Sequence, residues 1–139
     1  MQAQFIRDDA LVRIEVDPGS EMITTTWKGY VPSPEYRTIL LEVLDLVNSG
    51  GLRLWLSDSS CMGVILRSDE KWSIETFTPM LMQAGLRRVA VVRSMDFFSQ
   101  TASERMVEAT LGRVPYKVEF FNAMDKADQW LVAELQALA

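Results

Sequence analysis

Segments typical of helices and of strands alternate through most of this chain, and this alternation constrains the fold more than any other feature. The helical segments repeat apolar residues at spacings of three and four, and the segments between them are short and apolar. Strands that alternate with helices of this length are joined by crossovers, which predicts parallel pairing in an α/β sheet. The predicted helices run from Ser33 to Gly50-Gly51, from Ser68 to Gly85, from about Asp96 to Leu111 and from Asn122 onward, and the strands between them are Leu52–Leu56, Arg88–Val92 and Tyr116–Phe121.

The N-terminal part is typical of an antiparallel hairpin. Residues Leu11–Val16 alternate polar with apolar, the turn Asp17-Pro18-Gly19-Ser20 follows, and Met22–Trp27 is rich in β-branched and aromatic residues. Phe5-Ile6 is either a further short strand or a lead-in. The predicted fold is therefore a mixed α/β sheet of about five strands, with the hairpin attached to a parallel part and four helices covering it.

Capping and proline signals set the expected helix boundaries. Ser33, Ser68 and Asn122 stand where helix N-caps are expected, because their side chains accept hydrogen bonds from the first free amides. Pro79 lies inside the second helical segment and lacks a backbone donor. We therefore expect a kink or a division of that helix at Pro79.

The apolar pattern also predicts what the core contains. The nearly continuous run Arg88–Val92 is typical of a strand buried on both faces, inside a parallel sheet. In the third helix the residues expected to face the core are Phe98, Ala102, Met106 and Ala109.

Length and composition predict one ordered domain that spans residues 1–139. Apolar residues make up 48% of the 139 and charged residues 24%, which is the balance of a globular protein. The net charge is −5 and the basic residues are scattered, which argues against a nucleic-acid partner. The longest apolar runs are far too short to span a bilayer, and the N-terminus lacks the pattern of a secretion signal. We therefore expect a cytoplasmic protein without a membrane span.

The residues most used in catalysis and metal binding are scarce. The chain has no histidine, its one cysteine, Cys61, has no second thiol to pair with, and its seven glycines fit no phosphate-binding spacing. The sequence therefore predicts no cofactor, no metal site and no enzyme. Asp58 and Asp96 are the one pair of acids that we would nominate for catalysis, and no motif connects them.

Several tryptophan-containing segments give the chain a likeness to a known family. With the order of elements, they make the chain resemble the STAS domains and, within them, the SpoIIAA-like (STAS/SEC14-type) small bacterial proteins. The resemblance covers most of the chain and implies that fold and a non-enzymatic regulatory or protein-interaction role. The segments are Trp27-Lys28-Gly29, Tyr36-Arg37, Trp55-Leu56-Ser57-Asp58, Trp72 with Pro79, Val89-Ala90-Val91-Val92, and Ala127 with Trp130-Leu131.

A shorter likeness concerns the segment from Asp58 to Leu66. Its start resembles the Asp-Ser-Ser-Gly-Leu-Gly run of anti-sigma-factor antagonists, in which the first serine is phosphorylated. The resemblance implies that Ser59, or its neighbour Ser60, accepts a phosphate. The sequence departs from the family at Cys61, which stands where the family has glycine.

Polar residues follow three of the predicted parallel strands, where open α/β sheets usually bind ligands. These residues, which we predict to contact a ligand or a partner, are Asp58, Arg93, Ser94, Asp96 and Asn122. The alternative is that they are turn and capping residues, as Ser, Asp and Asn often are.

Two hypotheses of function remain open. In the first, the chain binds another protein or a second copy of itself through a loop from Ser57 to Arg67, with Ser59 or Ser60 as a switch. In the second, it carries or senses a small apolar ligand in a pocket between helices and sheet. The predicted lining of that pocket comes from Trp27, Trp55, Trp72, Met80, Met82 and Phe98.

Overall fold

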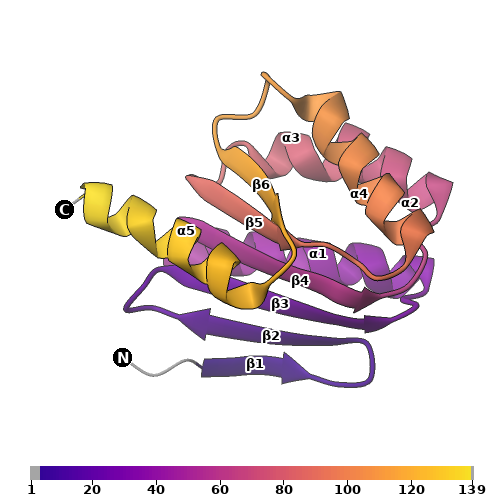
Figure 1. Cartoon of the computed structure of the whole chain (residues 1–139), viewed down its shortest axis with the longest axis horizontal. Coiled ribbons are helices and arrows are strands. Elements are labelled where there is room, and N and C mark those ends of the chain that lie inside the picture. Colours follow the sequence, from indigo (N-terminus) through magenta and orange to yellow (C-terminus); the bar gives the residue numbers. More distant parts are fainter. Residues whose placement is uncertain (1–3, 139) are drawn as a thin grey trace.

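The computed structural model describes residues 4–138 and contains one sheet of six strands that lie side by side in sequence order (Figure 1). Strands β1 to β3 pair antiparallel, and β3 to β6 pair parallel. The predicted mixed sheet is confirmed, with six strands instead of about five, because Phe5-Ile6 belongs to a strand. The strands are β1 Gln4–Asp8, β2 Val12–Asp17, β3 Met22–Gly29, β4 Leu54–Met62, β5 Arg88–Val92 and β6 Lys117–Phe121.

Strand β1 forms one open edge of the sheet. Phe5 and Ile6 are exposed there, and the pairing register with β2 shifts between Phe5 and Arg7. The Arg7 guanidinium lies 2.6 Å from the Asp9 carboxylate and 3.0 Å from that of Glu42 in the first helix. This edge strand is therefore irregular, and the charged side chain of Arg7 is held in place by two ion pairs.

Helices connect the parallel strands and follow the last of them. The second predicted helix is divided near Pro79, as expected, although the irregular turn η1 precedes the proline. Pro79 cannot donate a hydrogen bond to the carbonyl of Glu75, and a π-helical turn stands at this point. The elements are α1 Ser33–Gly50, α2 Arg67–Trp72, η1 Ser73–Phe77, α3 Thr78–Leu81, α4 Phe97–Thr110 and α5 Met124–Leu138. No helix within the described residues combines the length and the apolar character needed to cross a membrane.

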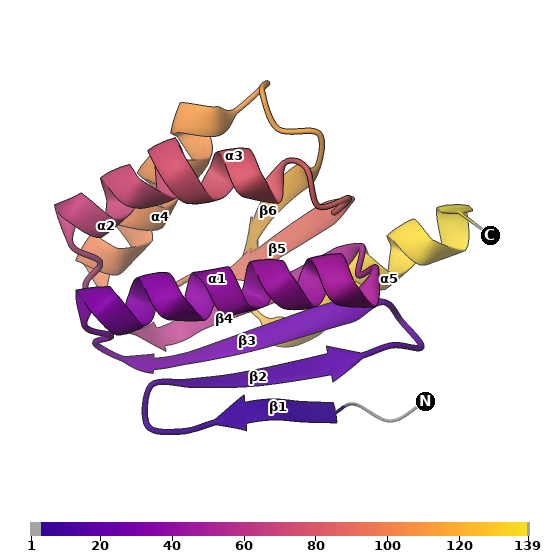
Figure 2. The same ribbon diagram turned by 180° about the vertical axis from the view of Figure 1, so that it is seen from behind.

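The helices cover the two faces of the sheet unequally. Each parallel crossover advances the sheet by one strand in the same direction, and right-handed crossovers of this kind place their helices on one face. Helices α1 to α4 accordingly share one face, whereas α5 lies on the other (Figure 2). On that second face Ala127 and Leu131 of α5 pack against Leu54 and Ala90. Strand β5 is buried on both faces, as its apolar run predicts.

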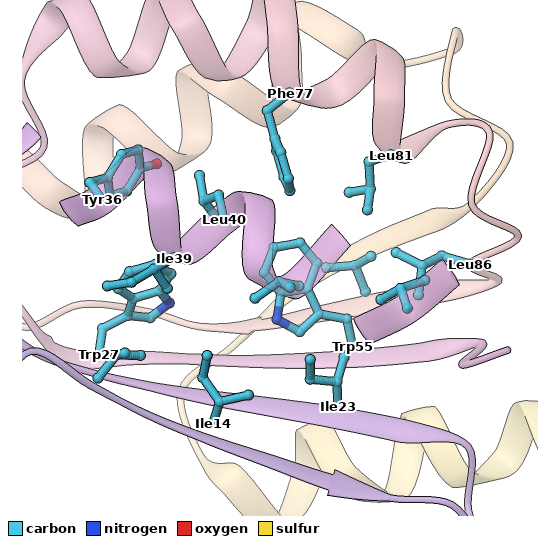
Figure 3. Close-up of a cluster of buried hydrophobic side chains, with 14 of the residues drawn as sticks. Ile14, Ile23, Trp27, Tyr36, Ile39, Leu40, Trp55, Phe77, Leu81 and Leu86 are labelled. Atoms are coloured by element: carbon cyan, nitrogen blue, oxygen red, sulfur yellow. The ribbon is translucent and has the colours of Figure 1, made fainter. Parts of the chain in front are cut away.

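The larger core, between the sheet and α1 to α4, combines aliphatic and aromatic side chains (Figure 3). Trp27 packs on Tyr36 with ring centroids 5.7 Å apart, and Trp55 meets the edge of Phe77 at 6.2 Å. Trp130 lies on the opposite face, 5.6 Å from Phe121. The indole N–H groups of the two core tryptophans are both satisfied: Trp27 Nε1 donates to Ser57 Oγ and Trp55 Nε1 to Thr25 Oγ1, each at 3.1 Å.

The end of β4 differs from the sequence-based prediction. The strand was expected to span Leu52–Leu56 and to be followed by a turn, but it continues to Met62. Strand β3 is long enough to pair with this extension, with Thr25 opposite Ser57 and Thr26 opposite Asp58. The predicted loop Ser57 to Arg67 is therefore wrong over its first half, and the irregular segment spans residues 63–66.

The three predicted N-caps are also wrong. Helix α5 begins at Met124, so Asn122 stands one residue before the cap position. Pro32 and Leu66 occupy the cap positions of α1 and α2, so that Ser33 is the first residue of its helix and Ser68 the second of its own. The Ser33 hydroxyl instead donates to the Asp69 carboxylate. Tertiary contacts have replaced the local capping bond at Ser33.

The buried face of α4 is rotated relative to the prediction. Ala102 is buried and Met106 packs on the core, as expected, but Phe98 and Ala109 are exposed. The buried face includes the polar residues Ser99 and Thr110, which a purely hydrophobic pattern does not identify.

Candidate functional site

The two acidic residues predicted to contact a ligand lie near the carboxyl end of β5 and form local hydrogen bonds: Asp58 lies within β4, opposite the last residue of β5, and Asp96 lies in the segment after β5. Asp58 accepts from the backbone N–H and the hydroxyl of Ser60, at 3.1 and 2.7 Å. Asp96 caps α4 by accepting from the Ser99 N–H at 2.9 Å. Each carboxylate thus has a structural role in its own segment, Asp58 in strand β4 and Asp96 at the start of α4, and no hydrogen bond joins the two as a catalytic pair.

Arg93, Ser94 and Asn122 lie at the same end of the sheet. Arg93 donates to the Asn122 side-chain oxygen at 3.3 Å, and its guanidinium covers the Phe120 ring at 5.2 Å. The buried Ser94 hydroxyl donates to the Met62 carbonyl at 2.7 Å and accepts from the Asp96 N–H at 3.0 Å. These contacts fix the loop after β5 against the end of β4. A role for these residues in partner binding stays a prediction.

The two candidate phosphoacceptors face opposite sides of β4. Ser59 is 4% exposed, and its hydroxyl lies 3.3 Å from that of Ser57 within the core. Ser60 is partly exposed and donates to Asp58. A kinase could reach Ser59 only if the strand opened, whereas Ser60 is nearer the surface.

An exposed apolar surface lies where β3, β4 and β5 end. Met95 is 90% exposed, Phe97 70% and Phe98 68%, and the two phenyl rings meet edge to face at 5.7 Å. Backbone hydrogen bonds join Met95 to Ser60 at 3.1 Å and Gly63 to Gly29 at 2.8 Å, which places three chain segments side by side. We call this surface the apolar end patch, and its residues are Tyr30, Val64, Leu66, Met95, Phe97 and Phe98.

Sequence reasoning missed the apolar end patch. The spacing of Phe98 with Ala102 and Met106 fits a helical stripe and predicts a place in the core, which is wrong. Met95 and Phe97 have no such spacing, so the helical pattern predicts no role for them. One signal in the sequence could have revealed the patch: three large apolar residues, Met95, Phe97 and Phe98, surround Asp96. The start of a helix does not require large apolar residues there.

A partly open cavity of about 140 Å³ lies between the sheet and helices α1 to α4, and we call it the sheet–helix cavity. Trp27 and Trp55 line it, as predicted for an apolar pocket, but Trp72, Met80, Met82 and Phe98 lie outside its lining. Tyr36 and Tyr116 also line it, and burial raises the pKa of each phenol to about 12. Its hydroxyl-bearing lining residues are otherwise Ser57, Ser59, Ser73, Thr78, Ser103 and Thr110.

Metal binding has no structural support in the part of the chain that is described. No group of three or more His, Cys, Asp or Glu side chains is arranged there to hold an ion. The lone thiol of Cys61 is exposed.

Comparison with known proteins identifies the fold. No protein-family model matches the chain, and no curated protein matches it. Among solved structures, apo-SiaC from Pseudomonas aeruginosa is similar with a TM-score of 0.51 and 12% identity, over 86% of this chain and 98% of that one. An uncharacterised DUF3478-family protein with a SpoIIAA-like fold, from Shewanella loihica, is similar with a TM-score of 0.50 and 15% identity, over 94% and 92%.

A third similar chain comes from the complex of the diguanylate cyclase SiaD with its activator SiaC, from P. aeruginosa. Its TM-score is 0.47 and its identity 16%, over 85% of this chain and 99% of that one. The two structures with a TM-score of 0.50 or above, apo-SiaC and the DUF3478-family protein, identify the class of fold to which this chain belongs. The chain has a SpoIIAA-like fold, which is the fold that the resemblance of its tryptophan-containing segments implied.

Proposed function

We propose that this chain is a non-enzymatic protein-interaction module that contacts a protein partner through the apolar end patch. The observation that carries the proposal is the exposure of Met95, Phe97 and Phe98 within four consecutive residues. Clustered large apolar side chains on a protein surface mark binding sites, because their exposure to water is unfavourable. SiaC, which has a similar fold, is the activator of a diguanylate cyclase and so acts through another protein.

The patch stands on a fixed support. The hydrogen bonds of Ser94 to Met62 and of Met95 to Ser60 tie its longest segment to the end of β4. A surface that is already ordered loses little conformational entropy when a partner binds. This anchoring favours recognition by a preformed surface.

Charge favours a different protein over a second copy of this chain. The net charge of −5 makes two copies repel each other. Arg67, whose side chain is 78% exposed, directly follows Leu66 at the border of the patch. A partner that complements this surface would present an apolar groove with a carboxylate near Arg67.

The test compares affinity-tagged chains in the cell of origin. The double variant Phe97→Ser/Phe98→Ser removes the two rings, and Leu111→Ser is the matched control, because Leu111 is 75% exposed just beyond the other end of α4. We expect one stoichiometric partner with the wild type and with Leu111→Ser, and its loss with the double variant. A partner retained by a folded double variant, or no stoichiometric partner with any chain, would overturn the proposal.

Ser60 is the better-placed residue for a phosphorylation switch. A phosphate there would replace the hydroxyl that donates to Asp58 and would add negative charge beside that carboxylate. The Ser60 carbonyl holds Met95, so the disturbance would reach the patch. We expect Ser60→Glu to weaken partner binding and Ser60→Ala to leave it within twofold. Equal binding by both variants would remove Ser60 as a switch.

Ser59 needs a different test as a candidate phosphorylation switch, because its side chain is buried. Ser59→Asp would place a carboxylate in the core, which is destabilising without a positive partner. We expect that variant to lower the melting temperature markedly. A folded Ser59→Asp variant with unchanged stability and altered partner binding would reassign the switch to Ser59.

A further inference from the structure

We propose that the sheet–helix cavity binds a small neutral molecule, about the size of one aromatic ring, that carries a hydrogen-bonding oxygen. The cavity volume of about 140 Å³ sets the size. An apolar cavity of roughly 150 Å³ is enough to hold benzene in another protein. The proposal concerns a site away from the apolar end patch and does not depend on the proposed function.

The lining determines the charge of the ligand. None of the residues that line the cavity is Asp, Glu, Lys, Arg or His, and the larger part of the exposed wall is apolar. An ion placed there would lose its hydration and gain no opposite charge, which is strongly unfavourable. The cavity therefore selects neutral molecules.

A short chain of hydroxyl groups on the sheet side of the cavity supplies the polar contact. Trp27 Nε1 donates to Ser57 Oγ at 3.1 Å, and Ser57 Oγ lies 3.3 Å from Ser59 Oγ. The two serines together have two hydroxyl protons, and their mutual contact uses one. The other proton is available for an acceptor in the cavity, and the oxygen of a small hydroxylated ring would serve as one.

The helical wall opposite the sheet contains the π-helical turn. Ser73 and Phe77 lie in η1, and both line the cavity. The Ser73 hydroxyl lies 3.3 Å from that of Tyr36, so a second polar pair stands on this side. Single π-helical turns are frequent at functional sites, because they redirect side chains that a regular helix would place elsewhere.

An access route adjoins the cavity between α4 and the open edge at β6. A groove of about 460 Å³ lies there and includes the backbone segment around Gly112. Val107, Thr110, Tyr116 and Val118 line both the groove and the cavity. A small molecule could therefore enter past these side chains without opening the sheet.

The experiment titrates the ¹⁵N-labelled chain with phenol, benzene and benzoate, and follows amide shifts by NMR. We expect saturable shifts around the cavity with phenol, affinity about fivefold lower for benzene, and no saturable binding of benzoate. One ordinary hydrogen bond accounts for a difference of that size. Ser59→Ala should lower phenol affinity about fivefold and leave benzene affinity within twofold.

Variants that fill the cavity provide the decisive control. Ser103→Leu and Val107→Phe enlarge two lining residues of α4, and each should lower phenol affinity at least tenfold. Glu108→Leu adds an apolar side chain to an exposed position of the same helix and should leave phenol affinity within twofold. The proposal is overturned if phenol gives no saturable shifts in the cavity, if benzene binds equally well, or if both folded filling variants bind phenol normally.

Discussion

The Ser33 hydroxyl donates a 2.6 Å hydrogen bond to the carboxylate of Asp69, and this contact joins the first turns of α1 and α2. Asp69 is 2% exposed and also accepts from Arg37 Nε at 2.9 Å. The buried charge thus has two donors from α1. It fixes the start of α2 beside the chain segment that leads out of β4.

Replacing Asp69 should destabilise the fold. Asp69→Ala leaves the Ser33 hydroxyl and the Arg37 guanidinium without their acceptor, and we expect the free energy of unfolding to fall by roughly 2–4 kcal/mol. Urea unfolding followed by tryptophan fluorescence measures it. Ser33→Ala is the control and should cost only about 1 kcal/mol, because Arg37 still pairs with Asp69. A loss below about 0.5 kcal/mol for Asp69→Ala would contradict the structural role assigned to this carboxylate.

Gly63 should tolerate no side chain. A Cβ atom there would lie 3.0 Å from the Tyr30 backbone nitrogen and 3.2 Å from the Gly29 carbonyl carbon, and backbone cannot rotate away. Gly63→Ala should therefore lower the free energy of unfolding by roughly 1–3 kcal/mol. Gly50→Ala is the matched control, since its Cβ would meet only the flexible Leu52 side chain, at 3.3 Å. Equal effects of the two variants in urea unfolding would show that the contact at Gly63 is not tight.

Two buried tyrosines should make stability fall in strong base. Burial raises the pKa of Tyr36 and of Tyr116 to about 12, from an ordinary value of 10. The unfolded chain releases these protons first, so the stabilisation is complete below pH 10 and is lost as pH rises through 12. Phenolate absorbance at 295 nm follows the ionisation. The double variant Tyr36→Phe/Tyr116→Phe should lose this part of the pH dependence of unfolding. If the variant and the wild type lose stability equally between pH 10 and 12, the two tyrosines are not the cause.

Asp9 should titrate at unusually low pH. The hydrogen bond from Arg7, with those from the Leu11 and Val12 N–H groups, lowers the pKa of the Asp9 carboxyl to about 2. The resulting stabilisation is present above pH 3.8, the ordinary value, and is lost as pH falls through about 2. Carboxyl ¹³C NMR gives the midpoint directly. Arg7→Gln should raise that midpoint, and a midpoint near 3.8 in the wild type would rule out the contact in solution.

The parts of the fold that periodicity encodes could be predicted from sequence. The apolar run of β5 gave its bounds and its burial on both faces, and Pro79 marked the divided helix. The end of β4 could not be predicted, because Ser57, Asp58 and Ser59 are typical of turns. They lie in a strand because β3 pairs with them and because Trp27 satisfies the Ser57 hydroxyl, and both partners are distant in sequence.

The sequence predicted partner contacts at the carboxyl ends of the parallel strands, and the apolar end patch, where we propose that a partner binds, lies at that end of the sheet. The residues of the patch were not predicted. The polar residues nominated at that end, such as Asp96 and Ser94, serve as cap and loop anchor. The exposure of Phe97 and Phe98 depends on the rotation of α4, which Asp96 and the buried Ser99 set and which no helical spacing reveals.

The irregular edge strand has a consequence for solubility. A flat, exposed β1 with Phe5 and Ile6 on it would invite pairing with the edge of another molecule and growth into aggregates. The register shift before Arg7 breaks the regular row of backbone donors and acceptors, and the ion pair with Asp9 keeps a charge at that place. At the opposite edge β6 exposes Lys117 and Glu119. Both edges thus oppose extension of the sheet by a second molecule.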